Sequence, residues 1–183
     1  MPSLLADTFG DRSFGSPKRI PSLLGNFHTA PFGWTGNNAT IEDQVRSTLE
    51  STMHGAMTNE AKNQTTQNLV QYLKSLKLPN TSNQHHDWEH AKSIFEAQGC
   101  ANCHLPEQEY TSPKTYEIGI RDESSNQAFN PPSLIGLKYR RLFFHDGRYL
   151  SLDELLGEHP KAEMPLSDGD LKELKRFLLR SKE

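Results

Sequence analysis

The sequence predicts an all-α fold with long irregular loops. Apolar side chains recur at helical spacing in three stretches, residues 69–76, 88–95 and 171–178. Nowhere does the chain keep the apolar–polar alternation of a half-buried strand. Hydrophobic residues make up 34% of the 183 residues, which is low for a self-sufficient core. We therefore expect a bound apolar group to supply part of the buried surface.

An internal repeat organises the chain into two related units. Pro-Ser-Leu-Leu-Gly at residues 21–25 returns as Pro-Ser-Leu-Ile-Gly at residues 132–136, so that position 21 shifts by 111 to position 132. The same shift aligns five further pairs: Phe32 with Phe143, Gly36 with Gly147, Ile41 with Leu152, Asp43 with Glu154, and Val45 with Leu156. A register kept over so long a stretch indicates two copies of one unit.

Each copy is expected to hold a capped helix and, further on, an amphipathic helix. Thr40 with Asp43, and Ser151 with Glu154, place a hydroxyl at a helix start and a carboxylate three residues later. Such side chains satisfy the free amides of a first turn. The closing helices are marked by Leu69, Val70, Leu73 and Leu76 in one copy and by Leu171, Leu174, Phe177 and Leu178 in the other. Ser167 is expected to cap the last helix.

A boundary between two domains is predicted near residue 80, because residues 78–84 have the turn-rich composition of a linker. We expect a smaller helical lobe at residues 1–80 and a second domain at residues 86–183. The second domain begins with a helix that leads to Cys100 and is marked by Trp88, Ala91, Ile94 and Phe95.

Charge and hydropathy exclude some classes of function. The formal net charge is −3, with acidic and basic residues interspersed, so nucleic-acid binding is not expected. No apolar run reaches the length of a membrane span. The first residues lack the basic and apolar blocks of a signal peptide, so we expect a mature product or a piece of a longer exported protein.

The two cysteines of the chain, Cys100 and Cys103, are two residues apart and directly precede His104. This spacing is the c-type haem attachment sequence, in which two thioethers bind one porphyrin and the next imidazole coordinates the iron. A zinc site would need two further ligands, and a redox dithiol is typical of a strand–helix context that the sequence does not show. The prediction is one covalent haem c, with His104 as the proximal ligand.

A second axial ligand would complete the iron coordination, and the candidates are His145, His159, Met164, Met53, Met57, His85 and His86. His85 and His86 begin the helix that ends near Cys100, which puts them about 20 Å from the motif at 1.5 Å per residue. His159 and Met164 lie in the irregular stretch before the last helix and can return over the opposite haem face. We favour His159, which gives a lower reduction potential than Met164.

Four motifs besides residues 100–104 carry a family resemblance: Asn-Pro-Pro-Ser-Leu-Ile-Gly at 130–136, Phe-His-Asp-Gly-Arg at 144–148, Ala-Pro-Phe-Gly-Trp at 30–34 and Ile-Glu-Asp-Gln at 41–44. With them the chain resembles bacterial di-haem cytochrome c peroxidases and their relatives. The resemblance implies two lobes built around class I cytochrome c cores, with residues 86–183 as the electron-transfer lobe. It places His159 at the distal-ligand position, usually a methionine, and Trp34 at the tryptophan between the two haems.

Departures from that family bear on activity. The first copy has no haem attachment motif, so residues 1–80 are similar to the rear part of a peroxidatic lobe. Gln44 matches a glutamine of the peroxidatic pocket, but Thr52 stands where a carboxylate should precede Met53. Arg-Arg-Leu at residues 140–142 replaces the Thr-x-Pro of the family's calcium site, which does not favour calcium. We assign no catalytic residue.

Arginines in the second copy are candidates for haem propionate contacts, because a guanidinium fork matches a carboxylate. These are Arg148, Arg140 and Arg141, for which a surface charge is the alternative. The predicted haem-binding set comprises Cys100, Cys103, His104, His145, Arg148 and His159, with His104 and His159 on the metal.

The predicted function is that of a c-type cytochrome that passes single electrons to a redox partner protein or a second haem domain. The alternative is the electron-feeding part of a di-haem peroxidase-like oxidoreductase. A haem sensor is a third hypothesis. We expect a periplasmic or otherwise extracytoplasmic location, because bacterial c-type haem is attached outside the cytoplasm.

Overall fold

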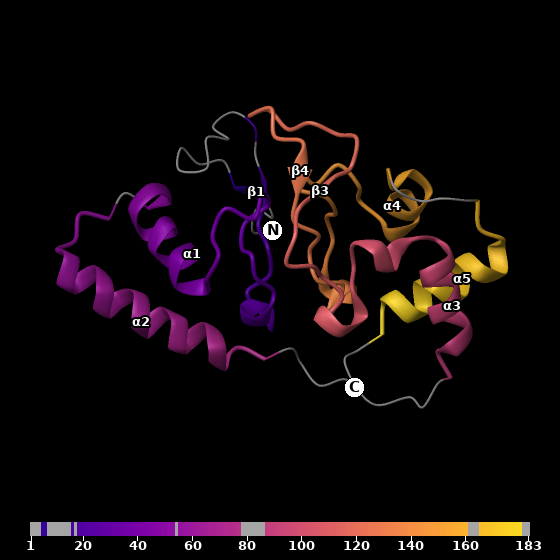
Figure 1. Cartoon of the computed structure of the whole chain (residues 1–183), viewed down its shortest axis with the longest axis horizontal. Helices are drawn as coiled ribbons and strands as arrows, with labels where there is room; N and C mark the ends of the chain where they lie inside the picture. Colours follow the sequence, from indigo (N-terminus) through magenta and orange to yellow (C-terminus); the bar gives the residue numbers. More distant parts are fainter. Residues whose placement is uncertain are drawn as a thin grey trace.

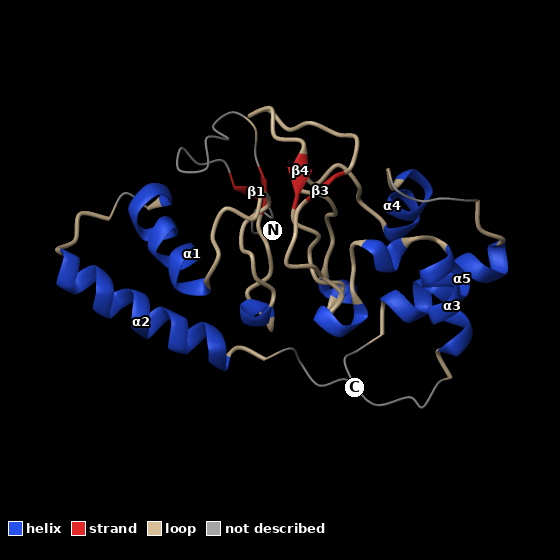
Figure 2. Ribbon diagram, in the orientation of Figure 1, coloured by secondary structure: helices blue, strands red, loops and turns tan. Residues whose placement is uncertain are grey.

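The computed structural model describes residues 5–6, 16, 18–53, 55–77, 87–160 and 165–180. Five α-helices in these ranges form two groups on either side of a centre of loops and short strands (Figure 1). None of these helices is long and apolar enough to cross a membrane. The helices and long loops of the predicted all-α fold are confirmed, but the described residues also form short strands that the prediction did not include (Figure 2).

The N-terminal part, which we define as residues 18–77, is built on two helices. Helix α1 (Ile41–Ser47) continues into a π-helical turn (Thr48–Thr52), and the long helix α2 (Asn59–Ser75) packs against α1. Their contact buries a small aliphatic cluster of Val45, Leu49 and Val70, with Ile41 and Leu73 at its margin.

The C-terminal part, residues 87–180, has the larger core. Helix α3 (Glu89–Ala97) packs against α5 (Asp168–Leu178), and α4 (Leu152–Glu158) lies between them in sequence. Phe95 and Phe177 meet edge to face, with ring centroids 5.9 Å apart, and both contact the ring of Tyr110. Aromatic pairs of this kind add to the stabilisation from burial alone.

Two pairs of two-residue strands lie between the helical groups. Strand β1 (Leu5–Ala6) pairs antiparallel with β2 (Lys18–Arg19), and β3 (Tyr116–Glu117) pairs antiparallel with β4 (Ala128–Phe129). Strands this short cannot produce a readable alternation in the sequence.

The predicted repeat is visible in the backbone at the same shift of 111 residues. The 3₁₀ turn Asn26–His28 corresponds to Leu137–Tyr139, and each follows a glycine with positive φ, 65° at Gly25 and 71° at Gly136. Glycine adopts this left-handed conformation without the penalty that a Cβ would bring. Isolated bridges also correspond, Phe32 with Asn38 and Phe143 with Tyr149. Both copies thus fold alike through the loop that precedes the capped helix.

The two copies meet through a reciprocal pair of backbone hydrogen bonds. The amide of Arg19 donates to the carbonyl of His145 at 2.7 Å, and the amide of Asn130 donates to the carbonyl of Trp34 at 2.9 Å. Arg19 corresponds to Asn130 in the repeat, and Trp34 corresponds to His145. Residue pairs that exchange roles in this way are the mark of a contact with two-fold symmetry.

The helix caps follow the sequence closely. Thr40 and Asp43 form a complete capping box, and the hydroxyls of Ser151 and Ser167 each accept a bond from an amide of the first turn. Glu154 differs from Asp43, because its carboxylate accepts from the amide of Leu150, one residue before the cap. The predicted linker at residues 78–84 lies outside the described residues.

Candidate functional site

A cavity of about 750 Å³ opens in the C-terminal part and reaches the N-terminal part. This volume lies within the roughly 300–1,000 Å³ typical of small-molecule and cofactor sites. Its wall is mostly apolar, with side chains from α3, α4, α5 and the loops between β4 and α4. Arg19 and Trp34 close it from the N-terminal part.

The turn that follows α3 brings the attachment motif to the cavity wall. Gly99 ends the helix with φ of 68°, and the 3₁₀ turn Cys100–Asn102 follows directly. The amide of His104 donates to the carbonyl of Cys100 at 2.9 Å, which tightens this turn. Cys100, Cys103 and His104 all line the cavity.

The ring of His104 is held by one of its two nitrogens. Nδ1 lies 3.0 Å from the carbonyl oxygen of Tyr110, to which it donates in the neutral tautomer. That leaves the Nε2 lone pair available for a metal, as is common for histidine ligands oriented through their other nitrogen. Burial lowers the pKa of His104 to about 4, so the ring is neutral near pH 7.

His159 lines the same cavity from the end of α4, where the backbone leaves the helix. Its ring meets that of Phe144 edge to face at 5.7 Å. Burial lowers the pKa of His159, and its charge in turn helps to lower the pKa of His104. The two predicted ligands therefore line the same cavity and are close enough to affect each other's protonation. Met164 lies outside the described residues, so the choice between His159 and Met164 remains a prediction.

Of the other histidine candidates, His145 also lines the cavity and is 3% exposed. Its ring stacks on Phe129, with centroids 4.7 Å apart, and meets Trp34 edge to face at 6.3 Å. Among the described residues, Nε2 of His145 has no hydrogen-bond partner. His145 thus joins the wall of the cavity at the contact between the two parts.

The remaining ligand candidates lie elsewhere. Met53 and Met57 belong to the N-terminal part, are 68% and 38% exposed, and do not line the cavity. His85 and His86 lie outside the described residues.

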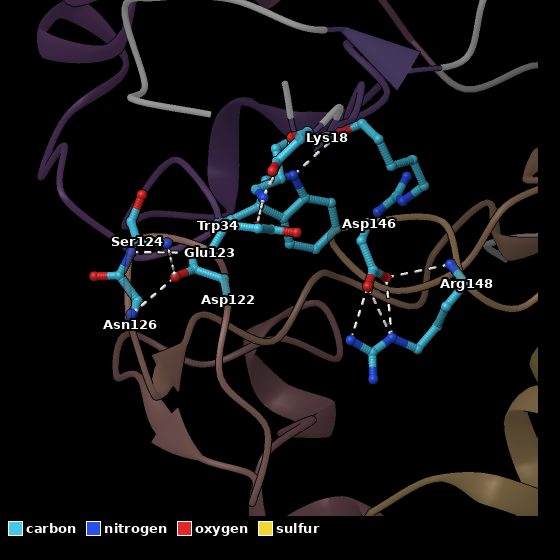
Figure 3. Close-up of polar contacts among 10 residues, drawn as sticks. Lys18, Trp34, Asp122, Glu123, Ser124, Asn126, Asp146 and Arg148 are labelled. Atoms are coloured by element: carbon cyan, nitrogen blue, oxygen red, sulfur yellow. Dashed lines mark hydrogen bonds and ion pairs between the residues drawn. The ribbon is translucent and has the colours of Figure 1, made fainter. Parts of the chain in front are cut away.

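The three predicted arginines take different positions. Arg140 lines the cavity, Arg141 is exposed, and Arg148 forms a forked ion pair with Asp146, at 2.9 Å from Nε and 2.7 Å from Nη2 (Figure 3). Arg148 does not line the cavity, and its role toward haem remains a prediction.

Sequence reasoning missed Arg19, which is 7% exposed and closes the cavity from the N-terminal part. Its guanidinium lies over the ring of Trp34, 4.6 Å from the centroid, and the indole N–H of Trp34 donates to the carbonyl of Arg19 at 3.1 Å. Next to it, Lys18 forms an ion pair with Glu123 (Figure 3). No motif surrounds Arg19, so only its alignment with Asn130 in the repeat could have drawn attention to it.

The site fits a covalently attached haem. It offers two thiols, an imidazole with a free nitrogen, a largely apolar wall and two enclosed arginines, Arg19 and Arg140. A macrocycle would take up the apolar surface, and its propionates would meet cationic side chains. Within the described ranges, no three His, Cys, Asp or Glu side chains converge as a metal-ion site.

Comparisons with known proteins identify a family and solved structures with a similar fold. Residues 88–178 match the family described as di-haem cytochrome c peroxidase. A chain of Kuenenia stuttgartiensis hydrazine synthase, solved under 20 bar of xenon, is similar with a TM-score of 0.76 and 16% identity, over 98% of this chain and 76% of that one. A MauG-like protein associated with microbial copper homeostasis is similar with a TM-score of 0.67 and 11% identity, over 97% of this chain and 76% of that one. No curated protein sequence matches the chain.

Proposed function

Residues 88–178 form a domain of the di-haem cytochrome c peroxidase family, and from this premise we propose that the chain is an electron-transfer cytochrome with one covalent haem. The family binds c-type haem and serves redox chemistry. The observation that carries the narrower proposal is the convergence of Cys100, Cys103, His104 and His159 on one cavity.

Each of these side chains has a distinct task. The thiols of Cys100 and Cys103 would form the thioether bonds to a haem, and His104 would hold its iron through Nε2 while the carbonyl of Tyr110 accepts a bond from Nδ1. His159 would supply the second protein ligand to the iron. A bound haem supplies reversible one-electron chemistry at its iron. The apolar wall keeps water from the site and, with the axial ligands, sets the reduction potential.

Electron transfer is favoured over turnover of peroxide, because two histidine ligands leave no iron position open for a substrate. The alternative, an electron-feeding part of a peroxidase-like protein, has one supporting observation. The cavity reaches Trp34 and Arg19 of the N-terminal part, so a route for electrons could leave the haem in that direction. Maturation of such a haem implies an extracytoplasmic location.

Spectroscopy of the matured protein tests the proposal. We expect covalent haem that resists extraction with acid acetone, and sharp low-spin bands in the reduced state that carbon monoxide and peroxide leave unchanged. Colourless protein after correct maturation would falsify haem attachment. Ready binding of carbon monoxide or turnover of peroxide would instead favour the peroxidase-like alternative.

The axial assignment has its own test. His159→Ala should convert the low-spin spectrum to a high-spin one, whereas Met164→Leu should leave it unchanged. Met53→Leu, an exposed methionine outside the cavity, is the matched control. The opposite pattern, with only Met164→Leu changing the spectrum, would transfer the ligand role to Met164.

A further inference from the structure

Two arginines with the same positive charge line the cavity. Arg19 comes from the N-terminal part and Arg140 from the C-terminal part, and both line the cavity. Burial lowers the pKa of each to about 10, and the charge of Arg19 further lowers the pKa of Arg140. Placing two cations within reach of each other in a desolvated site raises the energy of the apoprotein.

Within the described ranges, the side-chain hydrogen bonds of these two arginines go to carbonyl oxygens. Nε of Arg19 donates to the carbonyl of Phe144 at 3.1 Å. Nη2 of Arg140 donates to the carbonyls of Ser133 at 2.5 Å and Ile135 at 3.5 Å. Neutral oxygens orient the guanidinium groups but do not balance their charge.

Among the described residues, no carboxylate forms an ion pair with either arginine. Of the described residues, two acids line the cavity: Asp153, which is paired with Lys175 at 2.6 Å, and the exposed Glu158. Arg148, by contrast, has Asp146 as its own acid. A cation with little exposure normally has a charged partner, so the buried Arg19 and the half-buried Arg140 are suited to an anion from outside the polypeptide.

The repeat indicates that the positive charge of Arg19 is not required for the backbone contact between the two parts. Its counterpart Asn130 makes the equivalent backbone bond, and its side-chain amide donates to the carbonyl of Ser112 at 3.1 Å. A neutral side chain therefore serves at one side of the two-fold contact and a cation at the other. The charge of Arg19 has a task beyond holding the contact together.

We propose that Arg19 and Arg140 together bind a carboxylate across the contact between the two parts, and that this carboxylate is a haem propionate. The inference rests on the proposed function, since it takes the haem to occupy the cavity. Its consequence is that the N-terminal part completes the haem site and that the bound cofactor links the two parts. Arg19 and Arg140 act as positioning residues that also stabilise the propionate charge.

Substitution in the matured holoprotein tests this proposal, because thioether bonds retain the haem when a propionate contact is lost. Arg19→Gln removes the positive charge, and Arg19→Lys keeps the charge but not the two-pronged geometry of the guanidinium. Arg140→Gln removes the positive charge on the C-terminal side of the contact. Arg46→Gln is the matched control, since Arg46 is in the N-terminal part, does not line the cavity and bonds the exposed Asn63. The readouts are the reduction potential as a function of pH and the propionate bending band in resonance Raman spectra.

Loss of a cation beside a carboxylate favours the oxidised iron and raises the pKa of the propionate. We therefore expect both Gln variants to lower the reduction potential, to move the pH inflection of the potential upward and to shift the propionate band. Arg19→Lys should restore most of the potential but not the band, and Arg46→Gln should match the parent protein. Arg140→Gln keeps the test open if Arg19→Gln fails to fold.

Two results would overturn the proposal without touching haem attachment. One is a holoprotein with full haem content in which both Gln variants keep the parent potential and Raman band. The other is binding of acetate to the parent holoprotein that both Gln variants abolish, which would assign the site to a free carboxylate. Absence of covalent haem from the parent protein would instead remove the proposed function itself.

Discussion

The two copies of the repeat share a loop and a capped helix but differ in the surroundings of corresponding side chains. In the C-terminal part, Leu134 lines the cavity, whereas its counterpart Leu23 in the N-terminal part is 57% exposed. His159 leaves the end of α4 toward the cavity, whereas its counterpart Thr48 continues the helix into a π-helical turn and bonds the carbonyl of Gln44 at 2.9 Å.

This difference shows that the repeat alone does not make the site. The capped helix and the preceding loop occur twice, but only the C-terminal part has α3 and the turn with Cys100 and Cys103 to close a cavity over them. The N-terminal part buries its smaller aliphatic cluster between α1 and α2 instead. The same loop and capped helix thus border a cavity in the C-terminal part and an aliphatic cluster in the N-terminal part, depending on which helix packs against them.

The largest expected effect comes from removing the two thiols that distinguish the C-terminal part from the N-terminal part. The double change Cys100→Ala and Cys103→Ala should abolish all covalent haem, because the chain has only these two cysteines. Haem stain on a denaturing gel and the pyridine haemochrome spectrum measure the loss. Covalent haem that survives the double change would show that attachment uses other chemistry.

The two hydrophobic cores should differ in the cost of a deletion. Phe177→Ala, in the core beside the cavity, should lower the free energy of unfolding by about 3–5 kcal/mol. Leu49→Ala, in the small cluster of the N-terminal part, should cost about 2–3 kcal/mol, the low end for such a change, because a small cluster collapses more readily. Urea unfolding of the holoprotein, followed by haem absorbance and by circular dichroism, gives both values. Equal costs would mean that the two cores are packed equally well.

The pH dependence of the free energy of unfolding should arise from buried histidines of the C-terminal part. Burial lowers the pKa of His104 to about 4 from an ordinary value of 6.5, and it lowers the pKa values of His145 and His159 as well. In the haem-free double cysteine variant, the unfolded chain binds these protons first. The stability from neutral histidines is complete above about pH 6.5 and is lost as the pH falls toward 4.

Urea titrations of that variant between pH 4 and 7.5 measure the effect. Adding His104→Asn should flatten the profile, while His90→Asn, which changes an exposed histidine of α3, should not. A profile that is level over this range in the haem-free variant would contradict burial of neutral imidazoles.

The helix caps should give the smallest difference. Thr40→Ala breaks a complete capping box, whereas Ser151→Ala removes one hydroxyl bond and leaves Glu154 on the amide of Leu150. Each change should cost about 1 kcal/mol of stability, with the larger value for Thr40. Thermal unfolding of the two variants measures both. A larger cost at Ser151 would mean that α4 depends on its cap more than α1 does.

Local signals made much of this architecture predictable. The caps at Thr40, Ser151 and Ser167 depend on side chains within one turn, and the repeat register survives because each loop needs its own glycine, as at Gly25 and Gly136. The motif at Cys100 identified the site because its chemistry is contained in five consecutive residues.

Long-range contacts were beyond the reach of the sequence. Arg19 and Arg140 line one cavity only because the two copies are in contact, and no local pattern specifies that contact. His145 likewise stacks on Phe129 through a tertiary contact, and within the described part of the chain its Nε2 has no hydrogen-bond partner. The sequence pattern identified His145, but only the fold shows which atom remains available.

Main-chain atoms form the reciprocal hydrogen bonds of the contact between the two copies. The amide of Arg19 donates to the carbonyl of His145, and the amide of Asn130 donates to the carbonyl of Trp34. Almost any amino acid can supply those atoms, and proline at either donor position is the exception because it has no N–H. A contact of this kind can be retained in evolution while most of the side chains around it are replaced.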